Sequence, residues 1–178
     1  GVGTGKLRRK NSIKEKNDPR VKFMNSLKKK LPEIYFNLFG MNGVQPIWAS
    51  NFDKNIKDCY MGICLQRKPL LKYGLSDRIA QYLGNGLMVF IENETQYYDI
   101  LKRDEEAVYY DGVEDLAEKI KFYKQNKSKA LQIAHNGHKR IHSDFNERII
   151  TNYILDCLKY KNASRLQEKY NWPIHFYN

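Results

Sequence analysis

The stretch KYGLSDRIAQYLGNGLMVFIE, residues 72–92, decides the fold, because it joins a short amphipathic helix to a buried strand. Ser76 stands just before the helix, where a hydroxyl caps the free N–H groups of a first turn. The Gly-Asn-Gly turn at 84–86 then ends the helix. Residues 87–91 are apolar without alternation, which is typical of a central parallel strand buried on both faces.

The flanking sequence continues as an alternation of helices and strands. Before this stretch the pattern predicts a helix from Pro19 to about Leu31, a strand at 34–40, a short helix capped by Ser50 and a strand at 59–65. After it come a short helix capped by Thr95, a strand at 107–110, a helix opened by the capping-box pair Asp111 and Glu114, and helices near 128–142 and 145–160. An alternation of helices and strands that ends in several helices indicates a doubly wound α/β domain with a mostly parallel sheet.

Length and composition allow one globular domain with tails. The chain has 178 residues, of which 42% are hydrophobic, and this suffices for one core but not for two ordinary domains. Residues 1–19 are polar, Gly-rich and basic and are expected to form a loop or arm, whereas 20–160 form the domain. The segment 161–178 is rich in aromatic residues, namely Tyr170, Trp172, Phe176 and Tyr177. It is therefore expected to pack on the domain or on a partner domain.

The positive charge is concentrated at the N-terminal end. The net charge is +11, and residues 1–30 hold 11 Lys or Arg against Glu15 and Asp18, which leaves +2 for the other 148 residues. This distribution favours a solvated arm and makes nucleic acid the less favoured partner. An anionic partner of the arm, either nucleic acid or a membrane surface at the periphery, stays open as the alternative.

Hydropathy and cysteine usage bear on the compartment. No apolar run approaches the roughly 18 residues that a membrane-spanning helix needs, and the basic N-terminus lacks the apolar segment of a signal peptide. The chain has three cysteines, Cys59, Cys64 and Cys157, and no two of them form a CxxC pair. An odd number without such pairs argues against a disulfide framework and against a zinc cluster. We expect a soluble domain in a reducing, cytoplasmic compartment.

Three histidines, His135, His138 and His142, would share one face of their predicted helix. A metal site is one interpretation, but no Cys, Asp or Glu nearby is clearly placed as a further ligand. Exposed histidines on a basic helix are the favoured interpretation. We therefore expect neither a metal nor another cofactor.

The helix start at Ser76 is a candidate phosphate site. In doubly wound folds ligands bind at the carboxyl ends of the strands, where the following helices begin, and helix N-termini attract anions. Lys68, Lys72 and Arg78 lie close to this helix start in sequence, and Asp77 is the next residue after Ser76. Cationic side chains neutralise a diphosphate, while a hydroxyl and free N–H groups donate hydrogen bonds to it. The alternative is that Ser76 is only a structural cap.

Three segments between residues 44 and 160 carry a resemblance, namely GLSDRIAQYLGNGLMVFIE, EEAVYYDGVEDLAEKIKFY and ALQIAHNGHKRIHSDFNERIITNYI. In order and spacing they resemble the C-terminal half of the group 1 glycosyltransferases, in particular the spore-maturation-protein-B-like branch of the GT-B fold. The resemblance implies a Rossmann-like domain that binds a nucleotide-sugar donor. It also implies that Ser76, Arg78 and Lys72 face the donor diphosphate, and that Gln81 bonds the ribose hydroxyls. No residue is assigned as the catalytic base.

The same resemblance implies an N-terminal domain that binds the acceptor. No such domain is in the sequence, so we expect the chain to be part of a longer enzyme or one half of a split one. Two functions stay open: the donor-binding half of a glycosyltransferase, and a non-catalytic α/β module whose basic arm binds nucleic acid or an anionic surface. Binding through the arm would fall steeply with salt, whereas a nucleotide site would depend on the base and the sugar.

Overall fold

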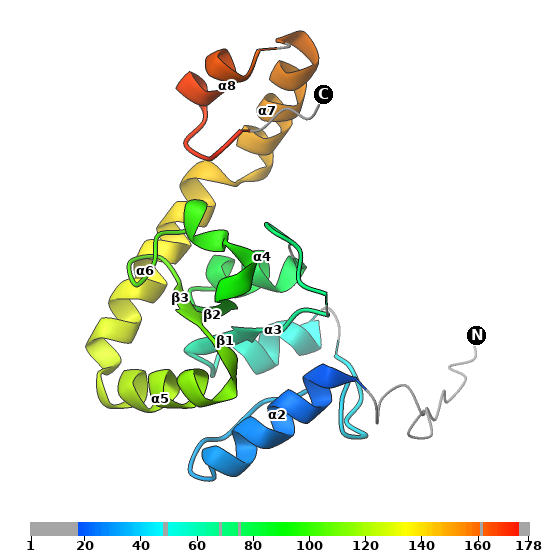
Figure 1. Cartoon of the computed structure of the whole chain (residues 1–178), viewed down its shortest axis with the longest axis vertical. Helices are drawn as coiled ribbons and strands as arrows, with labels where there is room; N and C mark the ends of the chain where they lie inside the picture. The colour runs from blue at the N-terminus through cyan, green and yellow to red at the C-terminus, as the bar shows by residue number, and fades with distance from the viewer. Residues whose placement is uncertain (1–17, 48–49, 68, 75, 161, 175–178) are drawn as a thin grey trace, which may run out of the picture. The chain divides into compact units, whose positions relative to one another are not determined.

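The computed structural model describes residues 18–47, 50–67, 69–74, 76–160 and 162–174 (Figure 1). The chain divides into two compact units, Gly1–Asp58 and Cys59–Asn178. The first unit contributes helices α2 (Pro19–Lys30) and α3 (Ser50–Ile56). The second unit holds the β-sheet and the remaining helices.

Helix α2 forms as the sequence predicts. The Asp18 side chain accepts a hydrogen bond from the Arg20 N–H (2.9 Å), and Pro19 occupies the first turn, where a missing N–H costs nothing. Met24 and Leu27 lie one turn apart on the helix and are buried. Apolar periodicity thus located both the helix and its inner face.

The strand predicted at 34–40 is wrong. In the described part of the chain, this segment has no strand, and every named strand belongs to the sheet of the second unit. The backbone turns at Gly40, which has a φ of +76° and whose N–H donates to the Val44 carbonyl (3.1 Å). An apolar run becomes a strand only where a neighbouring strand takes up its backbone N–H and C=O groups. The sequence of 34–40 does not reveal whether that neighbour exists.

A parallel sheet forms the centre of the second unit. Its strands are β1 (Met61–Cys64), β2 (Met88–Glu92) and β3 (Val108–Tyr110), in the order β1-β2-β3. Both pairs are parallel, with Ile63 opposite Phe90 and Phe90 opposite Val108. Residues 88–91 of β2 are all buried, as a central parallel strand requires. The strands predicted at 59–65, 87–91 and 107–110 are therefore confirmed.

The other elements of the second unit are helices. In chain order they are α4 (Asp77–Gly84), the 3-10 helices η1 (Asn93–Thr95) and η2 (Tyr97–Asp99), α5 (Gly112–Gln125), α6 (Lys127–Asp144), α7 (Glu147–Lys159) and α8 (Ala163–Lys169). Helices α4 and α6 contact β2 and each other, and α5 contacts β3. The structure therefore confirms the predicted α/β class, with a parallel sheet, flanking helices and further helices at the C-terminal end. This is the architecture of the Rossmann-like half of a GT-B fold. Among the described residues, none of the helices combines the length and the apolar character needed to cross a membrane.

Two predicted helix caps are corrected. Thr95 does not open a helix but closes η1, because its buried hydroxyl donates to the Glu92 carbonyl (2.7 Å) at the end of β2. Asp111 does precede α5, but the side chain that accepts its N–H is Asp115 (2.8 Å) rather than Glu114. Thr95 and Asp111 are both residue types that commonly cap helices. Which group each of them hydrogen-bonds depends on how the fold places the surrounding backbone.

The C-terminal segment packs through its aromatic residues. The Trp172 ring lies 5.1 Å from Phe145, 5.3 Å from Tyr153 and 5.0 Å from Tyr170 between ring centroids. The Tyr170 hydroxyl donates to the Asp156 carboxylate (2.6 Å), which also pairs with Lys169. Phe176 and Tyr177, the other two aromatic residues of this segment, lie outside the described residues.

Acid is expected to weaken this C-terminal packing. Hydrogen bonds from Lys169 and Tyr170 hold the pKa of Asp156 below its usual value. A carboxylate with a lowered folded-state pKa stabilises the fold fully above its unfolded pKa of about 4, and this contribution is lost as the pH falls through the folded value. Urea unfolding between pH 7 and pH 3 should therefore show a larger loss of stability for the wild type than for Asp156→Asn. Parallel pH profiles for the two proteins would contradict this.

Candidate functional site

The carboxyl ends of β1 and β2 lie side by side at one edge of the sheet. The Gln66 N–H, just beyond β1, donates to the Glu92 carboxylate at the end of β2 (3.2 Å). The Gln66 side-chain amide donates to the Gly74 carbonyl in the loop that leads to α4. These contacts hold the loop between β1 and α4 against the edge where ligands of open α/β sheets bind.

Ser76 and Arg78 meet at the start of α4. Ser76 is the N-cap residue, and its hydroxyl oxygen accepts from the Arg78 N–H (3.3 Å) and from Arg78 Nε (2.8 Å). Arg78 Nη2 donates to the Leu65 carbonyl just after β1 (2.7 Å). The cap predicted at Ser76 is therefore confirmed, and the guanidinium lies where β1 ends and α4 begins. The half-buried Arg78 combines a structural contact with a fixed positive charge at a helix N-terminus.

The structure places the other predicted site residues less closely together. The Lys72 ammonium lies over the Tyr73 ring, 4.8 Å from its centroid, and the Lys72 side chain is exposed. Asp77 is the exposed first residue of α4, and the exposed Gln81 follows it by four positions. Lys68 lies outside the described residues. Among the predicted site residues that the structure describes, Ser76 and Arg78 are in direct contact.

Sequence reasoning missed Tyr73 and Asp99 at this edge. Tyr73 has a φ of +55°, a conformation that side chains with a Cβ rarely adopt. Its N–H donates to the Thr95 carbonyl (2.9 Å), and its hydroxyl donates to the Asp99 carboxylate (2.6 Å), which raises the pKa of Tyr73. The two residues are far apart in the sequence, so local spacing offered no signal for their contact. They fix the loop before α4 to the connection between β2 and β3.

Cys64, at the end of β1, is not placed to react. It is almost fully buried, and this burial raises the pKa of its thiol to about 12. Thiolate, the nucleophilic form, is therefore scarce at neutral pH. Cys64 contributes to the core beside the site rather than to its chemistry.

Two of the three predicted surface histidines hold the other end of α4. His138 Nδ1 lies 3.1 Å from the Leu83 carbonyl oxygen, and His142 Nε2 lies 3.1 Å from the Gly84 carbonyl oxygen. Both carbonyls belong to the last turn of α4, where helices have no internal donor. Within the described ranges, no group of three or more His, Cys, Asp or Glu side chains is arranged to hold a metal ion. The histidine pattern thus serves helix packing.

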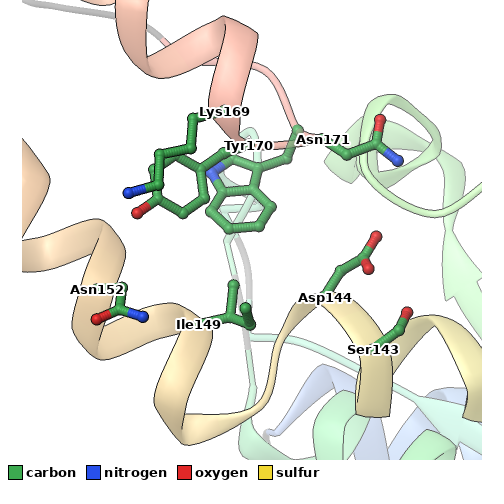
Figure 2. Close-up of a pocket in the computed structure, with 8 residues that line it drawn as sticks. Ser143, Asp144, Ile149, Asn152, Lys169, Tyr170 and Asn171 are labelled. Atoms are coloured by element: carbon green, nitrogen blue, oxygen red, sulfur yellow. The ribbon is translucent and has the colours of Figure 1, made fainter.

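A pocket lies elsewhere in this unit, where α6, α7 and the C-terminal segment meet (Figure 2). Its volume is about 180 Å³. The lining residues come from these three elements and are Ser143, Asp144, Ile149, Asn152, Lys169, Tyr170, Asn171 and Trp172. None of them is a predicted site residue.

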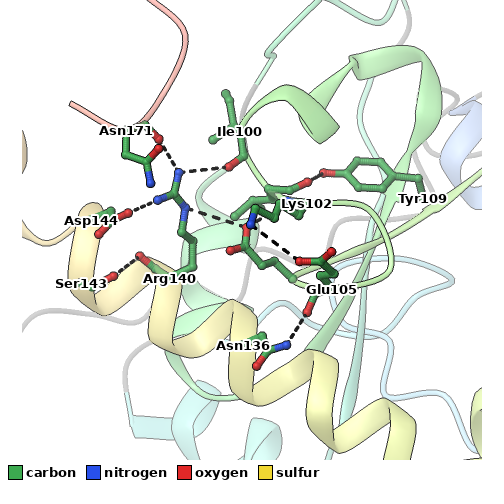
Figure 3. Close-up of polar contacts among 11 residues, drawn as sticks. Ile100, Lys102, Glu105, Tyr109, Asn136, Arg140, Ser143, Asp144 and Asn171 are labelled. Carbon is green, nitrogen blue, oxygen red and sulfur yellow. Dashed lines mark hydrogen bonds and ion pairs between the residues drawn. The ribbon is translucent and has the colours of Figure 1, made fainter. Parts of the chain in front are cut away.

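Arg140 connects the elements beside this pocket (Figure 3). Its guanidinium pairs with Asp144 and donates to the Asn171 carbonyl and, at 3.4 Å, to the Ile100 carbonyl. Its Nε lies 3.9 Å from the Glu106 carboxylate, and only 11% of the Arg140 side chain is exposed. Arg140 therefore ties α6 to the segment before β3 and to the C-terminal segment.

Comparison with known proteins agrees with this architecture. The model of a family described as Glycosyl transferase-like matches residues 15–156. Among solved structures, the chain is similar to the C-terminal domain of a glycosyl transferase group 1 family protein (LpcC) from Francisella tularensis, with a TM-score of 0.50 and 14% identity. The alignment covers 72% of this chain and 65% of that one, so the chain matches slightly less than two thirds of that solved domain. No curated protein matches the sequence.

The structural likeness and the family match support different conclusions. At 14% identity the likeness to the solved domain shows the fold alone. The family model covers most of the chain, including the sheet, α4 and α6. The spore-maturation-protein-B-like branch stays a prediction. On the family match, the chain belongs to the glycosyl transferase-like family.

Proposed function

We propose that the chain is the donor-binding part of a glycosyltransferase, which moves a sugar from a nucleotide-diphosphate sugar to an acceptor. The observation that carries this proposal is the contact of Ser76 and Arg78 at the start of α4, joined to the end of β1 through the Leu65 carbonyl. A helix N-terminus with a fixed guanidinium is a suitable site for a diphosphate. The match to the glycosyl transferase-like family supports a sugar nucleotide as its source.

The proposed mechanism rests on stabilising the leaving group. As the bond between the sugar and the diphosphate breaks, negative charge grows on the departing phosphate oxygen. Arg78 and the N–H groups of α4 would lie opposite that charge, and Lys72 and Lys68 would add further positive charge. Gln81 is proposed to bond the ribose hydroxyls, and Asp77 to accept a hydrogen bond from a further hydroxyl. The acceptor and its binding domain are proposed to lie outside this chain.

Removing Arg78 is expected to weaken nucleotide binding more than removing the Ser76 hydroxyl. A charge-assisted contact is worth about 1.5–3 kcal/mol and an uncharged hydrogen bond about 1 kcal/mol. Calorimetric titration of uridine, guanosine and thymidine diphosphates into the wild type, Arg78→Ala and Ser76→Ala, at two salt concentrations, measures both losses. Lys121→Ala, which removes an exposed cation of α5, is the matched control and should bind as the wild type does.

Both variants also lose native contacts, so stability is measured in parallel. Ser76→Ala should lower the free energy of unfolding by about 1 kcal/mol through the lost cap. Equal affinity of all four proteins, or a ranking of ligands that follows only their charge, would leave Ser76 and Arg78 as a structural pair. The second function, binding of nucleic acid or an anionic surface through residues 1–19, would show as affinity that disappears when this arm is deleted.

A further inference from the structure

The turn at Asn42 and Gly43 places an exposed side-chain carboxamide next to the backbone nitrogen of a glycine. We propose that this turn is a site of spontaneous chemical modification, at which Asn42 loses ammonia and becomes a mixture of aspartate and isoaspartate. The turn lies in the first unit and shares no residue with the proposed donor site. The inference therefore stands whether or not α4 binds a nucleotide.

The reaction needs only these two residues and water. The Gly43 nitrogen attacks the side-chain carbonyl carbon of Asn42, a new C–N bond closes a succinimide ring, and the side-chain nitrogen leaves as ammonia with the proton of the attacking N–H. Water then breaks one of the two C–N bonds of the ring. Cleavage at the side-chain carbonyl gives aspartate, and cleavage at the backbone carbonyl gives isoaspartate. Glycine favours the attack because it has no Cβ to hinder the approach to its nitrogen.

The chain holds three Asn-Gly pairs, at 42–43, 85–86 and 136–137, and the fold treats them differently. Asn136 and Gly137 lie inside α6, where Gly137 is buried. The Asn136 carboxamide donates to the Glu105 carbonyl (3.0 Å) and accepts from Gln132 Nε2 (3.0 Å). The attack on this side chain requires the middle of α6 to unfold, so this pair is protected.

The second pair is held by the last turn of α4. The Gly86 N–H, which would be the attacking group, donates to the Leu83 carbonyl (2.9 Å). The Asn85 carboxamide donates to the Gln81 carbonyl (2.8 Å). Both reacting groups are therefore occupied by helix carbonyls, and the end of α4 has to fray before they can meet.

The pair at 42–43 stands in a tight turn outside any helix or strand. Asn42 and Gly43 have φ values of +54° and +76°, and the Val44 N–H donates to the Met41 carbonyl (3.0 Å) across the turn. Two successive positive φ angles are typical of a type I′ turn, for which Asn-Gly is the favoured sequence. Both residues are exposed, and a Cβ on Gly43 would meet no atom within 4 Å. Such a turn opens without unfolding a helix, so its opening costs least of the three.

A contact with α2 restrains the reacting side chain. Asn42 Nδ2 donates to Asn25 Oδ1 (2.9 Å), and Asn25 Nδ2 donates back to Asn42 Oδ1 (3.5 Å). The carboxamide of Asn42 must leave Asn25 in order to turn toward the Gly43 nitrogen. Because the pair is exposed to water, it slows the reaction only modestly. The product carboxylate can no longer donate to Asn25, and each conversion adds one negative charge to the chain.

Peptide mapping by mass spectrometry, on the full chain incubated at mildly alkaline pH, measures the conversion at each pair. Asn42 should convert first, at least about a hundred-fold faster than Asn136. Asn25→Ala should speed the conversion of Asn42 about two- to five-fold, as expected for a weak hydrogen-bonded pair that is lost. Ser26→Ala, at an exposed neighbouring position on α2, is the matched control and should convert at the wild-type rate.

Incubation in urea separates the effect of the fold from that of the local sequence. In the unfolded chain the three pairs should convert at similar rates, because each glycine nitrogen is then equally free to attack. A rate difference that persists in urea would assign it to the flanking residues and would overturn the inference. So would conversion of Asn85 or Asn136 as fast as that of Asn42 in the folded chain, or equal rates at Asn42 in Asn25→Ala and Ser26→Ala.

Discussion

Gly137→Ala is expected to lower the free energy of unfolding by about 2–3 kcal/mol, although alanine is the better helix former. A Cβ at this position of α6 would lie 2.4 Å from the Glu106 carbonyl oxygen and 2.7 Å from Leu83 Cδ2. The first contact is with backbone, so relief requires α6 to move away from the segment before β3. Helix propensity alone predicts the opposite sign, a gain of about 1 kcal/mol. Urea unfolding of the wild type and of Gly137→Ala measures whether the free energy of unfolding falls or rises, and so decides between the two expectations.

Gly84→Ala is the matched control, because Gly84 is also helical and its Cβ would meet no atom within 4 Å. That variant should be neutral or more stable by up to about 1 kcal/mol. If Gly137→Ala is also neutral or stabilising, the close approach of α6 to α4 and to the segment before β3 is not a feature of the folded protein in solution.

Arg140→Met is expected to cost about 3–5 kcal/mol, the usual result of leaving a largely buried charge without its partner. The side chain keeps its length and its apolar stem, but Glu106 and Asp144 lose their cation and the Asn171 and Ile100 carbonyls lose a donor. Unfolding in urea measures the loss. Limited proteolysis should in addition cut the C-terminal segment sooner, because Arg140 is one of its attachments (Figure 3).

Lys139→Met is the control for the Arg140 change. Lys139 is the exposed neighbour on α6, so the same chemical replacement should stay within about 0.5 kcal/mol of the wild type. Equal stability of the two variants would mean that the Arg140 contacts contribute nothing net. Faster cleavage without a loss of global stability would confine the role of Arg140 to the C-terminal segment.

Features of the fold with a local cause could be predicted from the sequence. The apolar run at 87–91 became the buried β2, and Ser76 became the cap of α4 because a cap needs only residues within the first turn. The pair of Ser76 and Arg78 in the candidate site was predictable for the same reason, since the two residues are two positions apart.

Features that depend on partners far away in the sequence could not be predicted. The segment at 34–40 has strand-like residues, but pairing requires a neighbour that its own sequence does not specify. His138 contacts the Leu83 carbonyl 55 positions away, and Arg140 reaches Asn171 across 31 positions. The contact of Tyr73 with Asp99 and the pocket beside Trp172 likewise arise from the path of the chain, which no local spacing records.

The attachment of α4 to α6 bears on the motions of the proposed site. With only 8 residues, α4 is shorter than the roughly 12 at which a helix becomes even marginally stable alone. It depends on the burial of Ile79 and Leu83 and on the carbonyl contacts of His138 and His142 from α6. The two helices should therefore open and close as one cooperative unit in amide hydrogen exchange. A ligand at the first turn of α4 would then slow exchange along α6, in residues it never touches.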